Sequence, residues 1–151
     1  MATFRDTPYS AFNFLVELEP GQGEDVRAGF AEVSGLNAEL TVAEYRAGNA
    51  KTNYVTKVPG IHKAGDVTLK RGVIGAKNLW DWLDKARAGK PEAKREITIH
   101  LLSEDRSEKA VSWKLRGAMP LKWTGPSLNA KGGGDVALEE LVLAVETIEQ
   151  E

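Results

Sequence analysis

Four segments within residues 28–72 decide the fold: Ala28-Gly29-Phe30-Ala31-Glu32-Val33-Ser34-Gly35-Leu36, Glu44-Tyr45-Arg46-Ala47-Gly48, Lys57-Val58-Pro59-Gly60 and Val67-Thr68-Leu69-Lys70-Arg71-Gly72. Apolar residues alternate with polar ones in this stretch, and Gly or Pro interrupts the runs, which is typical of short strands joined by turns. No pattern of catalytic residues accompanies these strands. Strands that carry no candidate catalytic residues indicate a role in assembly.

Alternating apolar residues also predict strands elsewhere in the chain. They occupy residues 12–18, before a predicted turn at Pro20-Gly21-Gln22-Gly23, then 36–45, 97–101, 111–115 and 119–123. Gly117 separates the last two runs, so we expect them to pair as a hairpin. Residues 138–148 fit both helical and strand spacing, and the surrounding strands favour a strand.

One segment has helical periodicity. Leu79, Trp82, Leu83 and Ala86 recur at i, i+3, i+4 and i+7, which predicts a helix over about 76–88. Gly89 and Pro91 predict its end. The predicted fold is mainly β: two packed antiparallel sheets that form a small barrel or sandwich of about eight strands, with one flanking α-helix. We expect residues 1–151 to form a single domain.

Composition limits the classes of partner. A chain of 151 residues buries roughly two thirds of its unfolded surface on folding. The 20 basic and 22 acidic residues are interspersed, so no cationic surface indicates nucleic acid or anionic lipid, and proteins are the expected partners. The absence of cysteine excludes disulfides and thiolate metal sites.

The sequence also bears on location. Its first ten residues lack a basic segment followed by an apolar core, and no window approaches 18 apolar residues. We therefore expect synthesis in the cytoplasm without a signal peptide. We also expect no membrane insertion by this chain.

Candidate catalytic residues are few. The two histidines, His62 and His100, lie in different predicted elements without the spacing of a metal site, so structural roles are the better interpretation. Ser34 and Ser127 lack the Gly-x-Ser-x-Gly motif of a nucleophile elbow and are predicted turn residues. The glycines at 132–134 are not followed by the Lys and Ser or Thr of a phosphate-binding loop, which favours a flexible loop.

Three acidic pairs are candidates for general acid–base chemistry: Glu139 with Glu140, Asp81 with Asp84, and Glu104 with Asp105. Each pair lies among Lys or Arg residues, which predicts solvated faces. Asp81 and Lys85 have the i, i+4 spacing of an exposed helical ion pair. Trp82 and Trp113 are predicted for the core. We therefore predict no enzyme, no cofactor and no metal site.

A long polar excursion spans residues 44–58. Loops of this length in compact domains are usually functional or disordered, and exposed tyrosines offer rigid contact area at protein interfaces. The predicted contact residues are Glu44, Tyr45, Arg46, Gly48, Asn49, Tyr54 and Lys57. A mobile hairpin tip is the alternative.

Several segments carry a family resemblance when taken together: Phe12-Asn13-Phe14, residues 29–36, 44–48, 58–60, 67–72, 79–82 and 139–144. In this order, over nearly the whole chain, they resemble the phage tail tube protein family, which forms the inner tube of contractile phage tails and related contractile injection systems. The resemblance implies two β-sheets closing into a barrel with one helix at the side. It also implies hexameric rings that stack into a hollow tube.

The resemblance implies partners as well. They are further copies of the chain, a sheath protein, baseplate or spike and terminator proteins, and a luminal payload of protein or DNA, all within an assembled phage tail or injection particle. Residues 44–57 are implied to be an arm that reaches the next ring, where Glu44 and Arg46 set the register. The main tube subunit is the expected role, and an initiator or adaptor paralogue that joins tube to baseplate is the alternative. A monomeric β-barrel ligand-binding module and an enzyme are the alternatives from other classes.

Overall fold

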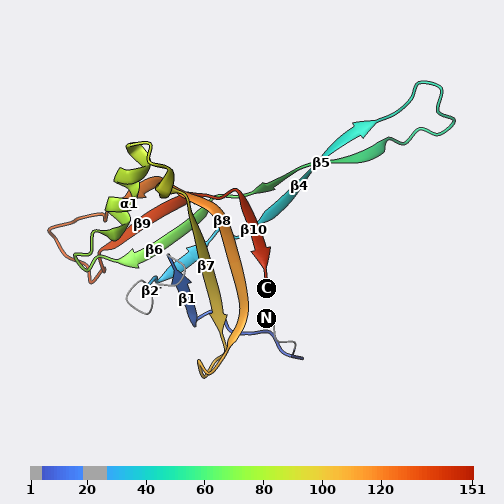
Figure 1. Cartoon of the computed structure of the whole chain (residues 1–151). Helices are drawn as coiled ribbons and strands as arrows, with labels where there is room; N and C mark the ends of the chain where they lie inside the picture. Colours follow the sequence, from blue (N-terminus) through green and yellow to red (C-terminus); the bar gives the residue numbers. More distant parts are fainter. Residues whose placement is uncertain (1–4, 19–26) are drawn as a thin grey trace.

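The computed structural model describes residues 5–18 and 27–151, so the turn predicted at Pro20-Gly21-Gln22-Gly23 lies outside the described residues. The elements in chain order are β1 Phe14–Glu17, β2 Arg27–Ala28, β3 Glu32–Ser34, β4 Ala38–Tyr45, β5 Thr56–Ala64, β6 Val67–Gly72, α1 Asn78–Arg87, the 3-10 helix η2 Pro91–Ala93, β7 Arg95–Leu102, β8 Lys109–Thr124, β9 Leu138–Ala144 and β10 Thr147–Gln150 (Figure 1). The fold is mainly β with one α-helix, as the apolar patterns predict.

All strand pairs are antiparallel, and β8 joins two groups of strands. The pairing order is β2-β1-β7-β8-β9-β6-β3, with β10 beside β8. Residues 109–118 of β8 pair with β7, whereas residues 119–124 pair with β9. Figure 1 shows β8 turning from the group that contains β7 and β10 toward the group that contains β9 and β6. One long strand therefore belongs to both packed sheets.

The hairpin predicted around Gly117 is wrong. β8 continues through Gly117, which has a φ of +65°, and the register between β7 and β8 shifts next to it. A residue in the left-handed region at a bulge bends a strand without ending it, and glycine adopts this conformation without steric cost. Gly117, which the sequence pattern indicated as a turn, is thus the position at which β8 bends from one sheet into the other.

The core lies between the two sheets and α1. Successive residues of β6 and β9 alternate between buried and half-buried, as a strand with one face on the core requires. The buried cluster consists of Val16, Leu18, Val67, Leu69, Leu79, Trp82, Ile97, Ile99, Leu115, Ala118, Leu141 and Leu143. Burial of each large member contributes roughly 1.5–3 kcal/mol. Trp82 is in the core as predicted, whereas Trp113 is half-buried and packs against it.

The segment that fits both helical and strand spacing, and the predicted helix, are now defined. Residues 138–148 form β9 and the start of β10, so the strand interpretation is confirmed. Helix α1 covers most of the predicted range and ends in a Schellman motif, because Gly89 N donates to Ala86 O at 3.1 Å and Lys90 N donates to Lys85 O at 3.2 Å. Gly89 has the positive φ of this motif, and Pro91 starts η2.

Candidate assembly surface

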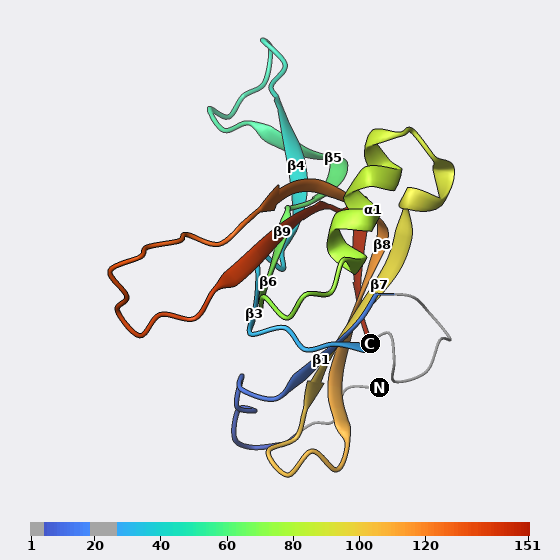
Figure 2. The ribbon, with the colours of Figure 1, turned by 90° about the vertical axis from the view of Figure 1, so that its left-hand side faces the viewer.

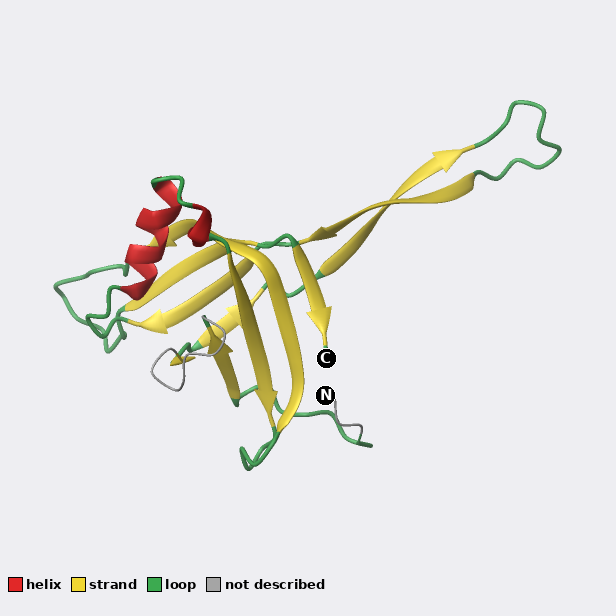
Figure 3. Ribbon diagram, viewed as in Figure 1, coloured by secondary structure: helices red, strands yellow, loops and turns green. Residues whose placement is uncertain are grey.

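Strands β4 and β5 form a two-stranded arm, defined here as residues 38–64, that projects from the packed sheets (Figure 3). Pairing begins at Ala38 with Ala64 and ends at Tyr45 with Thr56. The strand expected over 36–45 therefore exists, but it pairs in a separate sheet and its side chains are mostly exposed. An isolated two-stranded hairpin is at best marginally stable in water. A partner that covers the arm would therefore stabilise it.

Two pairs of opposite charges lie directly across the arm. Glu39 faces Lys63 in the register, and Glu44 faces Lys57. Such cross-strand pairs contribute roughly 0.2–1 kcal/mol each. The predicted contact residues Glu44 and Lys57 are thus brought together, within one chain, near the tip of the arm.

A bulge interrupts the arm between these charge pairs. Leu40 pairs with His62 and Val42 with Pro59, so two residues of β5 lie opposite Thr41 alone. Thr41 Oγ1 donates a hydrogen bond of 3.0 Å to the carbonyl oxygen of Ile61. A Cβ on Gly60 would lie 2.6 Å from Thr41 Oγ1 and 3.1 Å from Thr41 O. This close approach explains why residue 60 is glycine. The bulge increases the twist of the arm.

The loop at the tip of the arm is organised by Arg46. Its Nε donates to Thr52 O at 3.1 Å, and its Nη2 donates to Ala50 O at 3.2 Å. The predicted contact residues Gly48 and Asn49 form a turn closed by Ala50 N donating to Ala47 O at 3.0 Å. Both tyrosines of the tip, Tyr45 and Tyr54, are exposed.

Exposed apolar side chains extend along the whole arm: Leu40, Val42, Tyr45, Tyr54, Val55, Val58 and Ile61. Ile61 is 74% exposed at the bulge. Large exposed apolar patches on proteins indicate interaction sites, so these side chains make the arm a candidate for one. The sequence indicated the two tyrosines as contact residues but not Leu40, Val42 and Ile61, because Pro59-Gly60 interrupts the apolar pattern of β5. The signal available was the pair Val58 and Ile61 beyond the excursion.

The catalytic candidates are dispersed. His62 lies on the exposed arm, whereas His100 is buried in β7 with Nδ1 2.6 Å from Ser112 Oγ and Nε2 3.4 Å from Glu17 Oε1. Ser34 ends β3, and Ser127 lies in the loop between β8 and β9. The structure does not bring these four side chains together.

The acidic pairs have structural partners. Glu139 was predicted to be solvated, which is wrong: it is 7% exposed, and its Oε1 accepts a hydrogen bond of 2.5 Å from Nε of Arg71, which is 3% exposed. Trp123 Nε1 donates to Glu139 Oε2 at 3.2 Å, and Arg71 Nη2 donates to Asn78 Oδ1 at 2.6 Å. This buried network ties α1 to the sheet. On the exposed face of α1, Asp84 pairs with Arg87.

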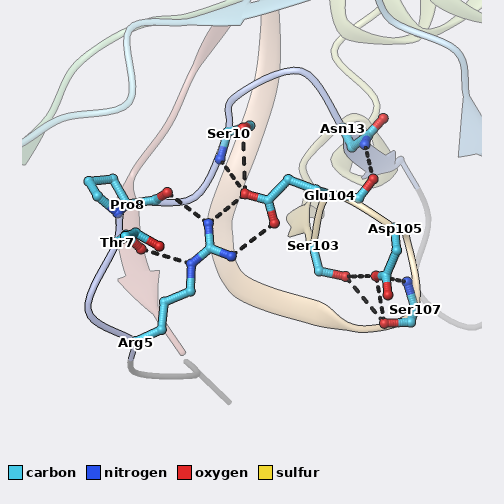
Figure 4. A network of polar contacts seen from close by, with 9 residues as sticks. All are labelled: Arg5, Thr7, Pro8, Ser10, Asn13, Ser103, Glu104, Asp105 and Ser107. Atoms are coloured by element: carbon cyan, nitrogen blue, oxygen red, sulfur yellow. Dashed lines mark hydrogen bonds and ion pairs between the residues drawn. The ribbon is translucent and has the colours of Figure 1, made fainter.

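The third pair, Glu104 and Asp105, anchors the N-terminal segment (Figure 4). Arg5 Nη1 and Nη2 donate to the two carboxylate oxygens of Glu104 at 2.9 and 2.5 Å. These bonds lower the pKa of Glu104 to about 2. Hydrogen bonds from Ser107 and Ser103 lower the pKa of Asp105 to about 2. Both carboxylates therefore stay charged acceptors at neutral pH.

Within residues 5–18 and 27–151, no group of three or more His, Asp or Glu side chains is placed to hold a metal ion. No helix in the described part of the chain is long and apolar enough to cross a membrane.

Comparison with solved structures identifies close structural relatives. A chain of the PVC sheath-tube complex, an extracellular contractile injection system in the extended state, is 29% identical with a TM-score of 0.82, over 95% of this chain and 91% of that chain. The anti-feeding prophage tube terminating cap is 28% identical with a TM-score of 0.83, over 100% and 95%. The PVC sheath/tube terminator is 28% identical with a TM-score of 0.82, over 97% and 98%.

Sequence comparison gives the family. Among curated proteins none matches the chain, but the model of the T4-like virus tail tube protein gp19 family matches residues 10–149. Tail tube proteins are structural, so this is not an enzyme. Because this match spans nearly the whole chain, the chain belongs to the T4-like virus tail tube protein gp19 family.

Proposed function

We propose that this chain is the repeated subunit of the inner tube of a contractile tail or contractile injection system. Hexameric rings of the chain stack into a hollow conduit that carries a payload of DNA or protein. Family membership supports a tube-related structural role, and the observation that carries the proposal is the exposed arm. A single folded unit over residues 1–151 suffices for this role.

The arm supplies the contact between rings. It projects beyond the sheets (Figure 1) and exposes apolar side chains along its length. Arg46 holds the tip loop in one conformation through its two carbonyl bonds. A preorganised, apolar hairpin loses little conformational entropy on binding, which favours affinity. The predicted contact residues Tyr45, Asn49 and Tyr54 lie at or next to the tip that meets the neighbouring ring.

Sheet edges supply the contacts within a ring. Strands β2 and β3 lie at the two ends of the pairing order, so each leaves one edge unpaired among the described strands. Unpaired edges template association with other chains, and a closed cyclic assembly covers them. Pairing across subunit boundaries would therefore join the sheets around the lumen.

The remaining partners follow from the relatives. Those structures comprise a sheath-tube complex, a tube terminating cap and a sheath/tube terminator. We accordingly assign a sheath protein and terminator proteins as partners of this chain, and family membership supports baseplate or spike proteins as further partners. The chain functions in the assembled particle.

A terminator or initiator role is the second candidate. The similarity to the tube terminating cap and to the terminator equals the similarity to the sheath-tube chain, with TM-scores of 0.82 to 0.83. A repeated subunit forms stacks of many rings. A terminator or initiator forms a single ring or caps a tube made by another protein.

Negative-stain electron microscopy with light scattering separates these roles. The tube subunit is expected to form rings six times the 16.5 kDa mass of the chain and stacks of such rings at high concentration. Single rings that never stack would favour the terminator role. A strict monomer, even with purified baseplate added as a nucleus, would refute both.

Charge reversal tests the arm. Glu44→Lys with Arg46→Glu keeps the net charge, but it puts a basic side chain opposite Lys57 and removes the carbonyl bonds of Arg46. Lys90→Glu with Glu92→Lys, on exposed residues after α1, is the matched control. We expect the arm variant to shorten or abolish tubes and the control to leave them intact. Unchanged tube length in the arm variant would contradict the role of the arm.

A further inference from the structure

The arm meets the packed sheets at a joint, defined here as residues 35–37 and 65–67. On the sheet side of the joint Ser34 of β3 pairs with Thr68 of β6, and on the arm side Ala38 of β4 pairs with Ala64 of β5. The two segments of the joint have equal lengths, so the register continues from the sheets into the arm. No ladder pair joins the two segments within the joint, all of whose residues the structure describes. Ladder hydrogen bonds therefore do not fix the direction of the arm.

Two close contacts between the segments involve glycine. Gly35 has a φ of +87°, and a Cβ at this position would overlap the carbonyl oxygen of Asp66 and lie 3.3 Å from its carbonyl carbon. A Cβ on Gly65 would overlap the side-chain amide of Asn37, with the Cγ of Asn37 at 2.7 Å. Only glycine permits such an approach. Each segment thus supplies one glycine against which the other segment packs.

These contacts oppose rotation of the arm. Leu36, between Gly35 and Asn37, is half-buried and packs against the buried cluster of the core. Hinge residues absorb large changes of φ and ψ, but here a rotation would press Gly35 into Asp66 or separate Asn37 from Gly65. We propose that the joint is a lock, which holds the arm in one direction in the unassembled chain. The inference rests on the proposed function in one respect, since it makes Gly35, Asn37 and Gly65 positioning residues for assembly.

A hollow of 340 Å³ lies beside the joint, between the base of the arm and the start of β10. Residues 38–40 and 62–64 of the arm and residues 146–148 line it. An arm free to turn would gain free energy by closing this hollow, because burial of apolar surface contributes roughly 25 cal/mol per Å². Leu40, which is 48% exposed, would then be covered. The lock keeps the arm extended and its apolar side chains available to a partner.

The extended direction of the arm is visible in two perpendicular views. The arm leaves the sheets beside β10 (Figure 1), and Figure 2, turned by 90°, also shows its tip beyond the sheets. An arm of fixed direction presents its tip at the same place in every copy. Binding then costs less conformational entropy than it does for an arm that must first be ordered.

Pulsed electron paramagnetic resonance tests the lock, because the chain contains no cysteine and takes spin labels only at introduced sites. Lys51→Cys in the tip loop and Glu92→Cys in η2 replace exposed residues on the two sides of the joint. The distance between the two labels is measured on the unassembled chain, below the assembly concentration. We expect one narrow distance distribution. A broad distribution would make the joint a hinge and overturn the proposal.

Two substitutions remove the contact at Gly65. Asn37→Ala deletes the amide that lies against Gly65, and Gly65→Ala displaces it. Each is expected to widen the distance distribution about twofold or more, because the joint then opens locally. In the double variant the added methyl group occupies the space that the amide leaves, so the distribution is expected to be narrower than in either single variant. Gly72→Ala, where nothing lies within 4 Å of the added Cβ, is the matched control and leaves the distribution unchanged.

Thermal unfolding distinguishes a released arm from an unfolded chain. The melting temperature of every variant is expected to stay within about 2 °C of the wild-type value, since these positions lie outside the buried cluster. A wider distribution at an unchanged melting temperature reports on the joint alone. Unchanged widths in both single variants, or additive widening in the double variant, would overturn the lock.

The outcomes separate the lock from the proposed function. In a chain that forms tubes, both single variants are expected to raise the critical concentration for assembly about threefold or more, because a smaller fraction of arms has the competent direction. A narrow distribution that both substitutions widen, in a chain that forms no rings even with baseplate present, would refute the proposed function and leave the lock intact. Tubes formed by a chain whose distribution responds to neither substitution would refute the lock alone.

Discussion

Arg46 and Thr52 lie on opposite sides of the arm tip, and the Nε of Arg46 donates a hydrogen bond of 3.1 Å to the carbonyl oxygen of Thr52. Arg46 also donates to the carbonyl oxygen of Ala50. The guanidinium that the sequence predicts to face a neighbouring ring therefore binds two carbonyls of its own loop. Arg46 therefore contributes to the conformation of its own tip loop.

Replacing Arg46 tests this role. Arg46→Ala is expected to speed exchange of the Ala50 amide, which donates to Ala47 O, about tenfold or more, because each lost hydrogen bond of the tip loop contributes about 1 kcal/mol. Arg46→Lys keeps the charge but lacks the planar fork that reaches both carbonyls, so it should behave like alanine. Hydrogen exchange followed by mass spectrometry measures the effect. Normal protection in the lysine variant would show that charge alone organises the tip.

The bulge of the arm gives a second prediction. Gly60→Ala places a Cβ 2.6 Å from Thr41 Oγ1, which displaces the hydroxyl from Ile61 and changes the twist of the arm. We expect tube assembly to fail while the melting temperature of the unassembled chain stays within about 2 °C, since an exposed arm contributes little to the core. Gly72→Ala, at the end of β6 and outside the arm, is the control, because nothing lies within 4 Å of its Cβ. Assembly of the Gly60→Ala variant at the wild-type concentration would contradict a role of the bulge in assembly.

The buried Arg71–Glu139 pair predicts a change in stability. Glu139→Gln leaves the Arg71 guanidinium buried without a counter-charge, which is expected to cost about 3–5 kcal/mol in the free energy of unfolding. Glu140→Gln, next to it and half-buried, should change the stability by less than about 1 kcal/mol. Urea denaturation below the assembly concentration measures both. Replacing the pair together by Arg71→Met and Glu139→Leu should recover much of the loss.

The N-terminal anchor predicts a pH dependence. The pKa of Glu104 in the folded chain, about 2, is below its ordinary value of 4.5. The anchoring contribution is therefore complete above about pH 4.5 and is lost as the pH falls toward 2. Pepsin digestion across this range should cleave within residues 5–13 progressively faster at lower pH, relative to a peptide substrate in the same buffer. Glu104→Gln should be cleaved readily at every pH tested, and a wild-type anchor that resists at pH 2 would contradict the assignment.

Much of this fold could be predicted because its signals are local. Period-two apolar runs predicted the strands around Val16, Leu69 and Ile99, and period-3.6 spacing with Gly89 predicted α1 within two residues at its start and one at its end. The excursion with Tyr45 and Tyr54 predicted the tip of the arm. These features depend on residues a few positions apart, which a sequence displays directly.

Only the tertiary structure decided which segments, far apart in the sequence, pair with each other and which side chains this pairing buries. Gly117 is a bend rather than a turn because β7 pairs on both sides of it. Glu139 is buried because β6 sets Arg71 directly opposite. Leu40 and Ile61 are exposed because β4 and β5 pair with each other and leave the sheets. The sequence alone determined that these segments are strands; which strands meet, and which faces remain for a neighbour, follows from hydrogen bonds between residues far apart in the chain.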